Sequence, residues 1–188
     1  MILYKRWHLW LRSNNIHEFF HRNSLSYQPL YHFLPGWKRC NIPEFLQGKI
    51  GVYAIFDRDQ KLQLVAYFRD VYFSLKQHLI RQPQKCYWIK VQTIERPKRS
   101  VLEEIREAWI AENGSPPPGN DTEQANWTQP IDTKSAMTEE EKAQDQNSEE
   151  LAQIKLLKKV ARRVEAEIVE ELKVRGVQME MRFSPKLK

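Results

Sequence analysis

The sequence predicts an α+β fold, in which a small three-stranded antiparallel sheet is flanked by helices and followed by a long helix and a short strand. Two strand-like runs separated by a polar turn at 57–60 indicate a hairpin. After residue 148, apolar residues recur every three to four positions, which is typical of one long amphipathic helix. A chain of 188 residues allows one compact domain with extensions.

The three predicted strands rest on composition and alternation. Residues 49–56 are rich in β-branched and aromatic side chains, as in a buried strand. Residues 61–67 alternate and are expected to pair with the first run across the turn at 57–60. Residues 86–95 supply the third strand of the sheet.

Two helices are expected between and after these strands. Asp70 is suited to cap a helix that runs through Leu79 with its apolar residues at helical spacing. Ser100 is followed three residues later by a glutamate, which predicts a capping box at the start of a second helix. Gly114 is expected to end that helix.

The chain divides by composition into four parts. Residues 1–44 form a basic, aromatic N-terminal extension, and residues 45–120 form the α/β domain. Residues 121–148 are rich in Pro, Asp, Glu and Gln and are predicted to be an acidic linker. Residues 149–188 form a C-terminal appendage of one helix and a short strand.

The C-terminal appendage is predicted from its apolar pattern. A helix over 149–175 is expected to end before Gly176, and residues 177–183 alternate as in a short strand. The helix needs a surface to cover its stripe, either the α/β domain or a second copy of the chain in a homodimer. The stripe consists of Ile154, Leu157, Ala161, Val164 and Ile168.

Composition limits the class of protein. The chain has 30 basic and 24 acidic side chains and a net charge of +6, which suits a polyanionic partner or serves solubility alone. No run of about 18 apolar residues predicts a transmembrane helix, and early charges argue against a signal peptide. Two cysteines, Cys40 and Cys86, are expected to be reduced in a cytoplasmic compartment.

Three short motifs occur in an order that resembles the GIY-YIG nuclease superfamily. They are Gly51-Val52-Tyr53, then Leu64-Val65-Ala66, and finally the Pro-Pro-Pro-Gly-Asn run at 116–120. Together with the run Leu75-Lys-Gln-His-Leu79, the pattern resembles a divergent branch of that superfamily. This branch includes the N-terminal domain of plant chloroplast monothiol glutaredoxins and related cyanobacterial proteins. The resemblance implies a plastid-like or cyanobacterial compartment.

The resemblance also implies a reaction, phosphodiester hydrolysis by an endonuclease that holds one divalent cation such as Mg²⁺. The catalytic candidates are Tyr53, Arg69 and His78, and the metal candidates are Glu103 and Glu107. Four of them have simpler interpretations: Tyr53 as a packed strand tyrosine, His78 as a core histidine, and the two glutamates as solvated charges on a helix face.

The active-site pattern of the superfamily is degenerate in this chain. Leu64 replaces a tyrosine, and Ser74 stands where an arginine on the first helix is expected. The position of the metal-binding glutamate falls near Arg106. The sequence therefore predicts weak or absent cleavage.

Nucleic-acid binding does not depend on cleavage. Cations that contact phosphates are interleaved with aromatic side chains that can stack on bases over residues 67–99. We therefore expect a DNA-binding or RNA-binding protein, and the alternative is a structural or protein-interaction module. The candidate nucleic-acid-binding residues are Lys76, Arg81, Lys90, Lys98 and Arg99.

A His-Glu-x-x-His pattern at His17–His21 fits a zinc peptidase motif, for which His32 is the nearest third ligand. Such enzymes need a sizeable domain around the motif. This pattern lies in a short basic extension, so we interpret it as a chance occurrence.

Overall fold

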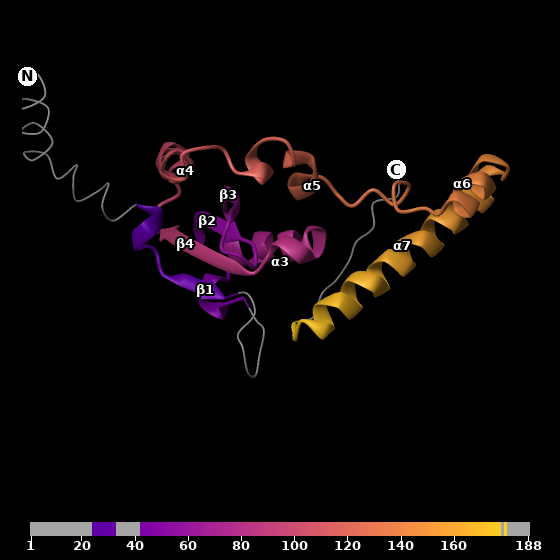
Figure 1. Ribbon diagram of the computed structural model, residues 1–188, viewed down its shortest axis with the longest axis horizontal. Helices are drawn as coiled ribbons and strands as arrows, with labels where there is room; N and C mark the ends of the chain where they lie inside the picture. The colour runs from indigo at the N-terminus through magenta and orange to yellow at the C-terminus, as the bar shows by residue number, and fades with distance from the viewer. Residues whose placement is uncertain (1–23, 33–41, 178, 180–188) are drawn as a thin grey trace, which may run out of the picture.

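A computed structural model describes residues 24–32, 42–177 and 179 of the chain. They form a four-stranded antiparallel sheet with helices on both faces (Figure 1). The strand order is β1-β4-β2-β3. The strands are β1 (Leu30–His32), β2 (Ile50–Phe56), β3 (Leu62–Phe68) and β4 (Trp88–Ile94).

The predicted hairpin is confirmed. β2 and β3 are adjacent and antiparallel, with Gly51 opposite Phe68 and Tyr53 opposite Ala66. β2 pairs on its other side with β4, so it lies inside the sheet. Alternate residues of β2 therefore face the two layers of helices.

The α+β class is confirmed, but the expected number of strands is wrong. The fourth strand, β1, adds to β4 in antiparallel register, with Leu30 opposite Lys90. β1 has only three residues, too few to show alternation, and it lies in the part expected to be an extension. Its place in the sheet comes from pairing with β4 rather than from its own pattern.

Helix α3 (Val71–Arg81) covers one face of the sheet. Its first turn is capped as expected, because the side chain of Asp70 accepts a hydrogen bond from Phe73 N at 3.1 Å. Val71, Leu75 and Leu79 pack with the inward side chains of β2, β3 and β4 in one buried cluster. This face also buries Tyr53 and Cys86.

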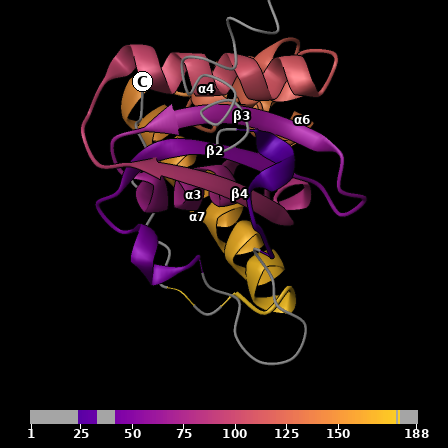
Figure 2. The ribbon, with the colours of Figure 1, turned by 90° about the vertical axis from the view of Figure 1, so that its left-hand side faces the viewer.

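Helix α4 (Arg99–Glu112) covers the opposite face (Figure 2). Leu102, Ile105 and Trp109 pack against residues of β2 and β3. The expected cap at Ser100 is wrong, because the N-cap of the helix is Lys98, two residues earlier, and its side chain makes no capping hydrogen bond. At the other end of the helix, the Glu112 carboxylate accepts hydrogen bonds from Leu25 N and Ser26 N of the 3₁₀ turn η1 (Leu25–Tyr27).

The chain after α4 returns along the outer strand β3. The 3₁₀ turn η4 (Pro118–Asn120) places Asn120 beside Val65. The Asn120 side chain accepts from Val65 N and donates to Val65 O, both at 2.7 Å. A Cβ atom at Gly119 would lie 2.6 Å from Gln63 O, so only glycine allows this approach.

The segment predicted as an acidic linker contains two helices, α5 (Gln124–Thr128) and α6 (Glu139–Gln146). Trp127 of α5 is fully buried against the α3 face of the sheet. We call residues 118–129 the cover segment. α6 starts with the capping box of Thr138 and Glu141.

The long helix α7 (Glu150–Val174) agrees with the predicted 149–175 and ends before Gly176, whose φ is +85°. Its beginning packs with Met137 through Leu156, Leu157 and Val160. Its end reaches the α3 face, where Leu172 is buried (Figures 1 and 2). The predicted burial of the stripe is only partly met. Ile168 packs against the α3 face of the domain, and Leu157 and Val164 pack in the cluster with Met137. Ile154 remains 38% exposed.

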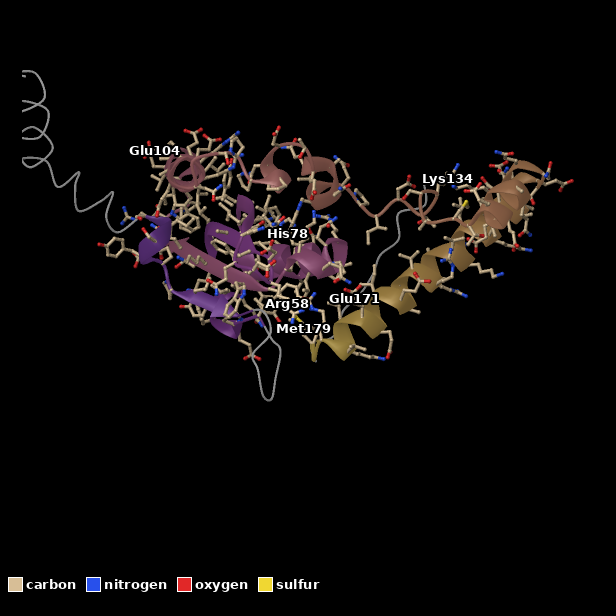
Figure 3. The ribbon with its side chains drawn as sticks, viewed as in Figure 1. Arg58, His78, Glu104, Lys134, Glu171 and Met179 are labelled. Carbon is tan, nitrogen blue, oxygen red and sulfur yellow. The ribbon has the colours of Figure 1, made fainter. Side chains whose placement is uncertain are left out.

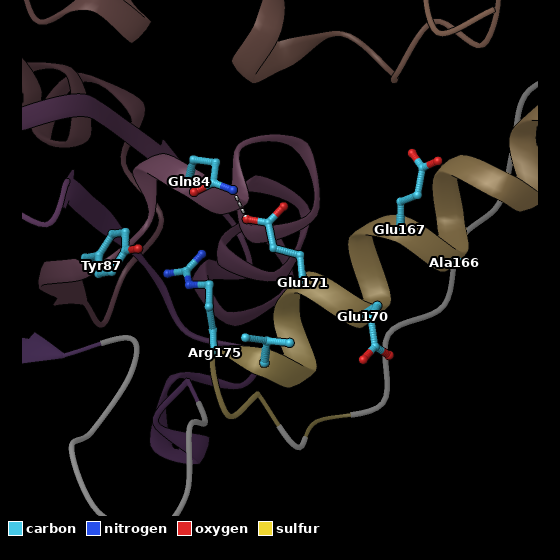
Figure 4. Close-up of a pocket in the computed structure, with 8 residues that line it drawn as sticks. Gln84, Tyr87, Ala166, Glu167, Glu170, Glu171 and Arg175 are labelled. Atoms are coloured by element: carbon cyan, nitrogen blue, oxygen red, sulfur yellow. Dashed lines mark hydrogen bonds between the residues drawn. The ribbon is translucent and has the colours of Figure 1, made fainter. Parts of the chain in front are cut away.

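The end of α7 is tied to the loop before β4, which includes the 3₁₀ turn η3 (Pro83–Lys85). Arg175 lies over the Tyr87 ring, 4.3 Å from its centroid, and donates to Cys86 O at 2.6 Å and to Pro83 O. An open groove of about 730 Å³ lies beside this contact (Figure 4). Most of the predicted strand at 177–183 lies outside the described residues.

Candidate functional site

A hydrogen-bonded cluster lies beneath α3, where Tyr53 of β2 meets two side chains of the helix. Ser74 and His78 are four residues apart and therefore share one face of α3. The Tyr53 hydroxyl oxygen lies 2.6 Å from Ser74 Oγ and 2.8 Å from His78 Nε2. Tyr53 and His78 are 1% and 5% exposed, so the cluster is closed to solvent. Figure 3 shows His78 in the interior of the domain.

The charge states of Tyr53 and His78 follow from their pKa shifts. Burial raises the pKa of Tyr53 far above its usual value, although the Ser74 hydrogen bond opposes the shift. Burial lowers the pKa of His78 to about 3, and the Arg81 charge acts in the same direction. Both groups are therefore neutral at pH 7. A neutral imidazole carries one N–H, so the donor direction along Ser74, Tyr53 and His78 Nε2 depends on which ring nitrogen of His78 is protonated.

The cover segment closes the cluster from outside. The Trp127 ring lies against His78, with 5.6 Å between ring centroids. The Trp127 carbonyl accepts a hydrogen bond of 2.9 Å from an Nη atom of Arg81. This carbonyl raises the pKa of His78 slightly, but His78 Nδ1 itself has no partner at hydrogen-bond geometry within the described residues.

The structure brings together two of the three predicted catalytic residues. Tyr53 and His78 are in contact, whereas Arg69 is exposed in the turn between β3 and α3. Ser74 completes the cluster, although the sequence drew attention to it only as a replaced arginine. The sequence reading also missed Trp127, which lies in the supposed linker. The spacing of Ser74, His78 and Arg81, which places all three on one helix face, is the sequence feature that could have indicated this cluster.

The two predicted metal ligands lie on α4, on the other side of the sheet from Tyr53. Glu103 forms an ion pair of 2.8 Å with Arg99, and that hydrogen bond holds the pKa of Glu103 below its usual value. Glu107 is exposed. The Tyr53 cluster offers a phenol, a hydroxyl and a neutral imidazole, a donor set that does not suit Mg²⁺. Within the described residues, no group of three or more ligands could hold a metal ion.

The predicted nucleic-acid-binding residues are not gathered on one surface. Lys76 lies over the Tyr72 ring on α3, and Arg81 on the same helix contacts Trp127. Lys90 donates to Leu25 O at 2.9 Å. Lys98 and Arg99 are at the start of α4, on the opposite layer.

Four cations flank one end of the sheet, and of the predicted nucleic-acid-binding residues only Lys98 is among them. The pairs Ile50–Ile94 and Gly51–Phe68 place the start of β2 beside the ends of β3 and β4. The flanking cations are exposed, and none of them forms an ion pair within the described residues. We call this set the basic end; it consists of Lys49, Arg69, Arg96 and Lys98.

The His17–His21 motif lies outside the described residues. His32, its suggested third ligand, belongs to β1 and is opposite Trp88 in the sheet. Within the described residues, no helix is long and apolar enough to cross a membrane.

Comparison with known proteins gives one partial similarity. The chain is 38% identical over 74 residues to the bifunctional monothiol glutaredoxin-S16, chloroplastic, of Arabidopsis thaliana. The match covers 37% of this chain and a quarter (25%) of the relative's length. It agrees with the resemblance to chloroplast monothiol glutaredoxins. No protein-family model matches the chain.

The buried histidine predicts a pH dependence of stability. Because the folded pKa of about 3 lies below the ordinary value of 6.5, the unfolded chain binds a proton in this range and the folded chain does not. The contribution of neutral His78 to the free energy of unfolding is therefore fully present above pH 6.5. It is lost as the pH falls toward 3, by up to roughly 1.4 kcal/mol per pH unit.

Urea unfolding of the wild type and His78→Gln at pH 5, 6 and 7 measures this slope. Glutamine keeps an amide that can accept from Tyr53 but does not titrate, so the variant should show a flatter profile. Carboxylates titrate lower and affect both proteins alike. Equal slopes would contradict a buried neutral His78.

Proposed function

We propose that this chain is a nucleic-acid-binding protein on a GIY-YIG-like scaffold, with weak or absent phosphodiester cleavage. The observation that carries the proposal is the basic end. Its four cations are exposed and form no ion pair within the described residues. Glu95 and Asp70 are next to two of them in sequence, and Asp70 is used as a helix cap. Such a surface attracts the phosphate backbone through release of its counterions.

The state of the Tyr53 cluster supports the second half of the proposal. Hydrolysis needs a water-accessible base and a group that stabilises charge on the phosphate. Tyr53 and His78 are closed to solvent and neutral, and the candidate carboxylates lie across the sheet. The partial similarity to a chloroplast protein supports a plastid or cyanobacterial compartment.

Binding can be tested with matched charge changes. We expect Arg69→Gln with Arg96→Gln and Lys98→Gln to weaken binding of DNA or RNA oligonucleotides. Each lost phosphate contact should lower the slope of log affinity against log salt by about one unit. Fluorescence anisotropy at several salt concentrations gives both quantities.

The control removes three exposed cations from α7 with Lys155→Gln, Lys158→Gln and Arg162→Gln, an equal change in net charge. If this control weakens binding more than the variant of the basic end, the binding surface is misplaced. A Mg²⁺ cleavage assay runs beside the titration. Robust turnover that Tyr53→Phe abolishes would contradict the proposed loss of cleavage.

A second candidate function, a protein-interaction module, is favoured by the outer face of α7. Leu151 is 74% exposed and Ile154 is 38% exposed, beside the cations of the same helix. A second copy of the chain or another protein would cover this face. Sedimentation of the full chain with and without Leu151→Lys would detect such an association. Absence of salt-dependent binding to nucleic acid in the anisotropy titration would favour this alternative.

A further inference from the structure

Arg81 is an incompletely paired cation at the edge of the Tyr53 cluster. It follows His78 by three residues on the same face of α3 and is partly buried. A guanidinium has five N–H donors in a planar fork. Within the described residues, its hydrogen-bond acceptor is a single neutral group, the Trp127 carbonyl.

The cover segment also contacts a second cation, Lys85. The carboxylate of Glu123 forms an ion pair with Lys85, four residues after Arg81. Glu123 comes just before α5 and Trp127 lies within it, so this short segment contacts one cation through a side-chain carboxylate and the other through a backbone carbonyl. A carbonyl oxygen and a carboxylate thus occupy positions that a bound anion would take.

We propose that Arg81 and Lys85 form a phosphate-binding site that the cover segment occupies, and that phosphate displaces this segment from α3. Phosphate supplies several charged oxygens to a fork that now holds one neutral acceptor, and Arg binds such oxygens in pairs. Displacement uncovers His78 and Tyr53. The inference rests on the proposed function, because the phosphate would belong to a nucleic acid.

Hydrogen exchange of the full chain, followed by mass spectrometry, tests the site. Inorganic phosphate should speed exchange of amides 123–129, and sodium acetate at equal ionic strength should not. Glu123→Gln should speed exchange without phosphate and raise the apparent phosphate affinity roughly two- to fivefold, because it removes one partly exposed ion pair that holds the cover.

Arg81→Gln should abolish the phosphate response, whereas Lys76→Gln, on the same helix but over Tyr72, should keep it. Circular dichroism checks the folding of each variant. If Arg81→Gln does not fold, the phosphate response of Lys85→Gln tests the same site. A phosphate response that survives both Arg81→Gln and Lys85→Gln overturns the proposal, and so does a wild type that does not respond.

Oligonucleotides with and without a 5′-phosphate separate a terminal phosphate from a backbone phosphate. A stronger effect of the phosphorylated oligonucleotide assigns the site to a strand end, and equal effects assign it to the backbone. If the wild type binds oligonucleotides but phosphate leaves the exchange unchanged, the Arg81 site is wrong and the proposed function stands. If neither binds, both are wrong.

Discussion

Gly51→Ala is expected to lower the free energy of unfolding by about 3 kcal/mol or more. The alanine Cβ would lie 2.4 Å from Gln92 O and 3.0 Å from Thr93 Cα. Both are backbone atoms of β4, so neither can rotate away, and the two central strands must separate. Chemical or thermal unfolding of the purified chain measures the loss, which corresponds to a melting temperature roughly 6–12 °C lower.

Gly48→Ala is the matched control for this prediction. Gly48 has a φ of +66° but no neighbouring atom within 4 Å of its would-be Cβ. Alanine there should cost about 1 kcal/mol for its left-handed backbone alone. If the two variants are equally stable, close approach of β2 and β4 is not what requires glycine at position 51.

Trp127→Ala is expected to cost about 3–5 kcal/mol and to change the protonation of His78. Trp127 is fully buried and forms the outer wall of the Tyr53 cluster. Its loss admits water to the imidazole, so the pKa of His78 should rise from about 3 toward 6.5. Urea unfolding gives the stability, and an NMR titration of the His78 ring gives the pKa.

Trp127→Phe separates packing from hydrogen bonding. The indole Nε1 is buried without a partner within the described residues, so phenylalanine removes no hydrogen bond and keeps most of the wall. We expect it to cost clearly less than alanine and to leave His78 unprotonated at pH 6. A His78 that remains neutral at pH 6 in Trp127→Ala would show that Trp127 does not exclude water.

The parts of the fold that follow local rules were predictable. The hairpin of β2 and β3, the Asp70 cap and the long helix up to Gly176 depend on alternation, capping and 3.6-residue periodicity. β1 was not predictable, because three residues show no period. The burial of Trp127 was also missed, since a lone tryptophan among polar residues gives no pattern and its partner His78 is 49 positions away in sequence.

The candidate site was predictable only in part. The pairing of Tyr53 with His78 follows from one inward strand position and one helix face, both visible in the sequence. The pairing of Arg81 with the Trp127 carbonyl is not visible, because it depends on where a loop returns. The basic end was missed for a similar reason: Lys49, Arg69 and Arg96 meet only when the strand register is known.

The contact of Asn120 with Val65 has a consequence for how the molecule avoids its own copies. β3 is an edge strand, and an edge strand offers free backbone groups to any other strand in solution. The side-chain amide of Asn120 imitates a neighbouring strand at one residue and so blocks intermolecular pairing there. Loss of the Asn120 side chain would therefore lower solubility as well as stability, because the uncovered backbone of β3 would start concentration-dependent aggregation.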